Sequence, residues 1–285
     1  MNPGNQTTER IPREQERPYL GLGLRLRREY IEDVLSETPE VDWFEVVSEG
    51  CMDLPEECLR SLEAVRNHYP LVMHGISMAI GSPWSIDRDY LARLKGMIER
   101  LQPAWISDHL CWNGADDIQG HMLPLPYSTD MLEHVVPRIR EVQDYLGMQI
   151  LMEIVPSERD DPNQEIPEAE FIADVAERSD SLILVDIENL HASGMNRGFS
   201  PEAYLERLPA HRVQQLHLIG ATALCEPGDE PAHSPDPVWE LYLQALARFG
   251  RVTTMVDRID TIPSLQEMVN EVAKARCGTS RFLSD

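Results

Sequence analysis

The chain has little positive charge and almost no lysine. Its 285 residues include 25 Lys+Arg against 49 Asp+Glu, a formal net charge of -24, and the only lysines are Lys95 and Lys274. Nucleic-acid binding needs a basic face for phosphate contacts, and an anionic membrane surface repels an acidic protein. The composition therefore disfavours nucleic acid and membrane as partners.

Long apolar runs and paired cysteines are also missing. No segment approaches the roughly 20 apolar residues of a membrane span, and the first residues, MNPGNQTTERIPREQERP, have no apolar core. The five cysteines are odd in number and show no metal-type pair spacing. We therefore expect a protein of the reducing cytoplasm. We also expect residues 1–18 to form a flexible tail and residues 19–285 a single domain.

Short apolar runs alternate with longer segments of helical period. The runs are typical of strands buried on both faces, and they cover residues 20–24, 43–47, 71–74, 105–108, 149–153, 182–186, 215–218 and 252–257. Eight strands that alternate with helices predict an α/β fold, a single (β/α)8 TIM barrel. A doubly wound open sheet is the alternative, but no G-x-G-x-x-G follows a strand. Gly21 and Gly23 lack that spacing, and we expect them to relieve crowding in the first strand.

Polar residues mark the starts and ends of several predicted helices. The capping residues are expected at Ser85, Ser128, Ser200 and Asp236, because such side chains accept the free N–H groups of a first turn. Gly147 and Gly250 are expected to end two helices. The helices predicted in this way cover residues 90–101, 132–146, 168–178, 203–208 and 239–249.

Imidazole or carboxylate side chains stand at the ends of most predicted strands. In such barrels the functional residues lie at these ends, and here they include Glu45, His74, Asp108, His109, Glu153, Asp186, His217 and Asp257. A single histidine or aspartate is commonly structural, and Asp108 or Asp186 could cap the next helix. Their convergence on one rim instead predicts a metal cluster of iron, manganese or zinc. No G-x-S-x-G nucleophile motif is present.

Several segments resemble the multinuclear non-heme iron-dependent oxidative enzymes, the MNIO family. They are GLGLRLR at 21–27, DWFEVVSE at 42–49, HGISMAIGS at 74–82, ISDHLCW at 106–112 and LVDIENLHAS at 184–193. The resemblance implies a xylose-isomerase-like TIM barrel with two or three irons. It also implies an oxidoreductase that uses O2 to modify a ribosomally synthesised peptide, usually at cysteine. The implied partners are a cysteine-containing precursor peptide and a separate peptide-recognition protein.

The resemblance also implies roles for individual residues. One iron would be held by His74, His109 and Glu153, and a second by Glu153, Asp186, His217 and Asp257. Glu45 and Asp108 would orient the ligand imidazoles or nearby waters, and Asn189 would lie on the substrate side or bind a third metal.

The chain departs from the family pattern at several positions. Glu188 replaces an asparagine, Ala221 replaces a histidine, and the expected Asp-x-His is missing from the loop at 228–233. Asp257 replaces a glutamate and shortens its reach. These departures favour two iron sites and leave the third incomplete. Two alternatives stay open: a non-redox isomerase or hydrolase that uses zinc or manganese, and a metal-poor binding protein that has lost catalysis.

Overall fold

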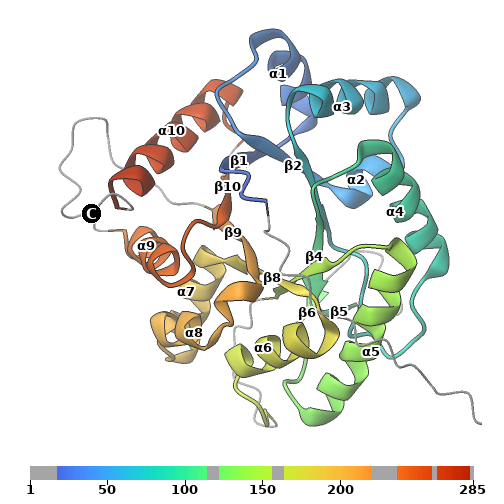
Figure 1. The fold of residues 1–285 in the computed structure, drawn as a ribbon, viewed down its shortest axis with the longest axis vertical. Coiled ribbons are helices and arrows are strands. Elements are labelled where there is room, and N and C mark those ends of the chain that lie inside the picture. The colour runs from blue at the N-terminus through green and yellow to red at the C-terminus, as the bar shows by residue number, and fades with distance from the viewer. Residues whose placement is uncertain (1–17, 114–121, 156–163, 220–235, 259–261, 283–285) are drawn as a thin grey trace, which may run out of the picture.

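The computed structural model describes residues 18–113, 122–155, 164–219, 236–258 and 262–282. Eight parallel strands in this part close into a barrel, and helices surround it (Figure 1). The order around the barrel is β1 (Leu22–Arg25), β10 (Thr253–Asp257), β9 (Val213–Ile219), β8 (Leu182–Asp186), β7 (Ile150–Ile154), β4 (Ile106–Leu110), β3 (Leu71–Gly75) and β2 (Trp43–Val47). The predicted TIM barrel is therefore confirmed.

The helices and the short elements follow the expected alternation. They are η1 (Arg28–Tyr30), α1 (Ile31–Glu37), α2 (Ser48–Met52), α3 (Glu56–His68), α4 (Arg88–Leu101), β5 (Trp112–Asn113), β6 (Met122–Leu123), α5 (Thr129–Leu146), α6 (Glu168–Ser179), α7 (Ile187–Arg197), α8 (Pro201–Arg207), η2 (Ala210–Arg212), α9 (Pro237–Phe249) and α10 (Leu265–Phe282). The antiparallel pair of β5 and β6 was not predicted, because each strand has only two residues.

Most of the predicted helix caps are present. The side chains of Ser128, Ser200 and Asp236 accept backbone N–H groups at the starts of α5, α8 and α9. The prediction for α4 was wrong by two residues, because Asp87 rather than Ser85 accepts its first N–H groups. The helix begins at Arg88, so Asp87 is the residue next to the free donors of the first turn.

The first strand is crowded at its glycines, as the sequence predicts. Gly21 has a φ of +87°, a conformation that favours glycine. A Cβ on Gly23 would lie 2.3 Å from the indole of Trp43 on the neighbouring strand. Gly23 therefore leaves the space that the large Trp43 side chain fills.

The barrel interior consists of an apolar layer below a polar one. Because alternate residues of a strand face the same side, an inward apolar residue is followed two positions later by another inward residue. The apolar layer includes Trp43, Val72, Trp105, Leu151, Leu184 and Met255. Two residues further on, the same strands carry Glu45, His74, Ser107, Glu153, Asp186 and Asp257, all buried. The apolar layer thus supports a polar layer at the carboxyl ends of the strands.

The predicted tail, except for Pro18, lies outside the described residues, so the division at residue 18 stays a prediction. Among the helices that the structure describes, none combines the length and apolar character needed to cross a membrane.

Candidate metal centre

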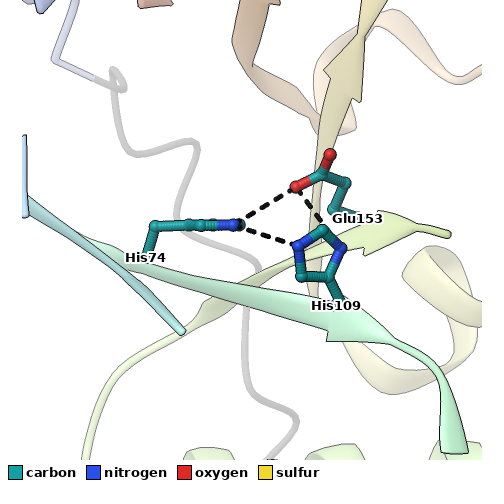
Figure 2. A group of neighbouring side chains, drawn as sticks. All are labelled: His74, His109 and Glu153. Atoms are coloured by element: carbon teal, nitrogen blue, oxygen red, sulfur yellow. Dashed lines mark hydrogen bonds and ion pairs between the residues drawn. The ribbon is translucent and has the colours of Figure 1, made fainter. Parts of the chain in front are cut away.

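His74, His109 and Glu153 point toward one another from β3, β4 and β7 (Figure 2). The Nε2 atoms of His74 and His109 are 3.2 Å apart. Oε2 of Glu153 lies 3.6 Å from Nε2 of His74 and 3.7 Å from Nδ1 of His109. All three side chains are buried, so the sequence-predicted residues of the first set come together in the polar layer.

A second group shares Glu153 with the first. Glu153, Asp186 and His217 each offer a ligand atom, and these atoms lie within 4.8 Å of one another. The three side chains come from the adjacent strands β7, β8 and β9 and are buried. Glu153 therefore stands between two groups of side chains that could each hold a metal ion.

Two buried atoms of the first group have no hydrogen-bond partner. They are Oε2 of Glu153 and Nδ1 of His109. Burial raises the pKa of Glu153 to about 8 and lowers the pKa of His109 to about 4, because both charged forms lose water. Unpaired buried polar atoms cost free energy. A divalent cation would satisfy both atoms, and mixed imidazole and carboxylate donors suit iron, zinc or manganese.

Glu45, which was expected to orient a ligand imidazole or a nearby water, lies beside His217. Oε2 of Glu45 lies 3.1 Å from Nε2 of His217 and accepts a hydrogen bond of 2.7 Å from Nε2 of Gln215. The Oε1 atom of Gln215 in turn accepts the indole N–H of Trp105 at 2.7 Å. These hydrogen bonds fix the Glu45 carboxylate between the apolar layer and the second group.

Ser107 makes the corresponding contact with His74. Its Oγ lies 2.8 Å from Nδ1 of His74, and Nε2 of that ring faces His109 and Glu153. The sequence analysis missed Ser107 and Gln215. Strand alternation could have found them, because each lies two residues before an inward-facing histidine.

Asp108 was expected to orient a ligand imidazole or a nearby water, and its carboxylate lies outside both groups of potential ligands. Its carboxylate accepts the backbone N–H of Met78 at 3.3 Å and lies near Gly75 and Tyr90, on the α4 side of the barrel wall. Burial, and then the charge of Glu49, raises the pKa of Asp108. Side chains alternate between the two faces of a strand. Asp108, one residue before the inward-facing His109, therefore points away from the barrel interior.

Asp257 does not join the second group, although it was expected to. Oδ1 accepts a hydrogen bond of 2.9 Å from Arg27, and Oδ2 lies 3.2 Å from Nε of Arg25. Oδ1 also accepts the backbone N–H of Arg258 at 2.8 Å. Its carboxylate thus faces two guanidinium groups, and the sequence analysis singled out neither arginine.

Asn189 was expected to lie on the substrate side or to bind a third metal. It helps to line a small pocket that also touches Glu153 and Asp186. Oδ1 of Asp186 accepts the backbone N–H of Asn189 at 2.8 Å and so caps α7. Asp186 therefore caps a helix and also lies beside Glu153. Ala221 and the loop at 228–233 lie outside the described residues.

Solved structures of similar fold are xylose-isomerase-like barrels. The 3-keto-D-glucoside 4-epimerase of E. coli has a TM-score of 0.60 at 14% identity, covering 90% of this chain and 99% of the other. A xylose isomerase domain protein of Alicyclobacillus acidocaldarius has a TM-score of 0.53 at 16% identity, covering 92% and 97%. At such identities the likeness shows the fold alone.

Relatives in sequence are bacterial proteins called UPF0276. One from Anaeromyxobacter sp. is 43% identical over 265 residues, 91% of this chain and 93% of the relative. Another from Caulobacter vibrioides is 40% identical over 272 residues, 93% and 96%. A family model for the RiPP precursor modification enzyme MbnB/TglH/ChrH matches residues 21–279. The chain therefore belongs to this family of enzymes that modify ribosomally synthesised peptides, the MNIO family that its motifs resemble.

Proposed function

We propose that this enzyme is an iron-dependent oxidoreductase that uses O2 to modify a precursor peptide at cysteine. The observation that carries the proposal is the position of Glu153 in two buried groups of potential ligands. Such a shared carboxylate suits two neighbouring ions. Family membership supports a peptide substrate, while the family resemblance supports iron, O2 and cysteine.

Under this proposal, His74, His109 and Glu153 hold one iron, and Glu153, Asp186 and His217 hold the second. The bound irons would supply the one-electron chemistry that O2 oxidation of a cysteine requires. Positioning the substrate and excluding water remain tasks of the protein.

The chain's own side chains orient the proposed ligands. Ser107 fixes the ring of His74 through Nδ1, and Glu45 fixes the ring of His217 through Nε2. Such partners set the tautomer and increase the basicity of a ligand imidazole. The apolar layer below the site, with Trp43 and Trp105, keeps water from that side.

Asn189 is proposed to contact the peptide. It shares the cavity with Glu153 and Asp186, and its amide offers both a donor and an acceptor. Because the cavity walls are otherwise mainly apolar side chains such as Ile172 and Leu208, Asn189 would orient a polar group of the substrate near the metals.

The test uses iron loaded into the protein without oxygen. Metal analysis should find two irons per chain, and O2 consumption should require a cysteine peptide encoded by a neighbouring gene. Mass spectrometry would locate the modified residue. The Glu153→Ala variant should lose both metal and O2 consumption. Iron-loaded protein that consumes no O2 with any such peptide would refute the oxidative function, and activity with zinc or manganese that ignores O2 would favour the non-redox alternative.

A further inference from the structure

Arg25 ends β1 and directs its side chain into the polar layer. It pairs with Glu45 in the register of β1 and β2, and it lies two residues after the inward-facing Gly23. Its Nε atom is 3.2 Å from Oδ2 of Asp257, and its Nη2 is 3.8 Å from Oε1 of Glu45. The Arg25 side chain is 30% exposed, against 3% for Asp257 and 0% for Glu45. Arg25 is thus a solvent-accessible cation beside buried acids.

Arg27 contacts the same carboxylate in a different way. It donates hydrogen bonds to Oδ1 of Asp257 and to the backbone carbonyl of Arg258, and these bonds connect β1 to the end of β10. Nε of Arg25, in contrast, has no hydrogen-bond partner among the described residues, and the contact of Nη2 with Glu45 is too long for a hydrogen bond. Arg25 therefore keeps donor capacity that the described residues leave unused.

The two arginines explain why Asp257 is absent from the second group. Both of its oxygens face a guanidinium, and Oδ1 also caps the N–H of Arg258. To bind a metal, Asp257 would have to give up its contacts with both guanidinium groups and with the N–H of Arg258. Asp257 is thus placed to hold Arg25, not an ion.

The charge balance favours an anion next to Arg25. Without metals, the buried carboxylates of this layer outnumber its arginines. Two divalent ions in the groups around Glu153 would reverse the balance and leave excess positive charge. A planar guanidinium with free donors matches a carboxylate, which it binds through two parallel hydrogen bonds.

We infer that Arg25 binds a carboxylate of the substrate peptide beside the metal centre, and that Asp257 is the counter-ion that orients Arg25 instead of a metal ligand. The inference rests on the proposed function for a peptide substrate. It does not depend on which reaction follows binding.

Binding of short peptides to the metal-loaded protein without oxygen tests the inference. The probes are N-acetyl-Ala-Cys-Gly with a free carboxylate, the same peptide as an amide, and the amide of N-acetyl-Ala-Cys-Asp. At least one acidic peptide should bind about tenfold tighter than the neutral amide, since a hydrogen bond to a charged group has this magnitude. The two acidic peptides distinguish a terminal carboxylate from a side-chain one.

The variants identify the residue responsible. Arg25→Gln should abolish the preference for the acidic peptide, Arg25→Lys should keep part of it, and Arg27→Gln should keep most of it. Asp257→Asn should retain the wild-type metal content. The inference is wrong if the wild type has no preference, if Arg25→Gln keeps it, if Arg27→Gln removes it equally, or if Asp257→Asn loses a metal. Calorimetry measures binding without turnover, so a failure of the oxidative function would be seen separately.

Discussion

Oε2 of Glu45 lies 3.1 Å from Nε2 of His217, and both side chains are almost completely buried. Although burial opposes the charge on each group, Glu45 raises the pKa of His217 to about 9, and His217 holds the pKa of Glu45 well below its usual range. The contact therefore fixes the imidazole within the second group. It also joins β2 to β9 across the barrel.

Replacement of this carboxylate should weaken one metal site selectively. Glu45→Gln keeps the shape of the side chain but removes the charge that supports His217. We expect about 10- to 100-fold weaker metal binding at the second site, the effect of losing such a partner, and little change at the first. Competition with a chelator measures both affinities. Equal losses at the two sites would contradict the assignment of Glu45 to His217.

Glu153 should be the residue on which both metals depend. Glu153→Ala is expected to lose both ions, because its carboxylate belongs to both groups. His109→Ala should lose the first ion and Asp186→Ala the second. Elemental analysis after anaerobic loading gives the number of metals per chain. A Glu153→Ala protein that keeps one full equivalent would show that the carboxylate is not shared.

Ser107 and Asp108 form a matched pair on one strand. Ser107→Ala removes the partner of His74 and should weaken binding at the first site by about tenfold. Asp108→Asn should leave metal affinity unchanged, because that side chain faces away from the barrel interior and contacts Met78. Chelator competition compares the two variants. The opposite pattern, with loss only in Asp108→Asn, would overturn the orientation of both residues.

The barrel and most of the site could be predicted from strand patterns. Apolar runs ended at His74, Glu153, Asp186 and His217, and parallel strands bring such ends together. The prediction for Asp108 ignored the alternation of side chains, although the adjacent His109 already occupied the inward position. Alternation is visible in the sequence, so this difference was avoidable.

Other features depend on contacts that no local pattern reveals. Asp257 faces the barrel interior, as a metal ligand would. Arg25 and Arg27 come from the other end of the chain, however, and contact its carboxylate. Only the closure of β1 onto β10 brings them together. The choice between Ser85 and Asp87 as a cap likewise depends on where the loop before α4 turns.

Substitution of Gly23 tests whether the apolar layer of the barrel interior determines the stability of the barrel. Gly23→Ala would place a methyl group 2.3 Å from the ring of Trp43, which is itself packed without exposure in the floor. Overpacking of this kind costs about 1–3 kcal/mol, so urea unfolding should show a clear loss. The matched control is Gly96→Ala in α4, where a Cβ meets nothing within 4 Å, and alanine should stabilise that helix by about 0.5–1 kcal/mol. If Gly23→Ala is as stable as the wild type, Trp43 can move, and the apolar layer does not rigidly support the polar layer above it.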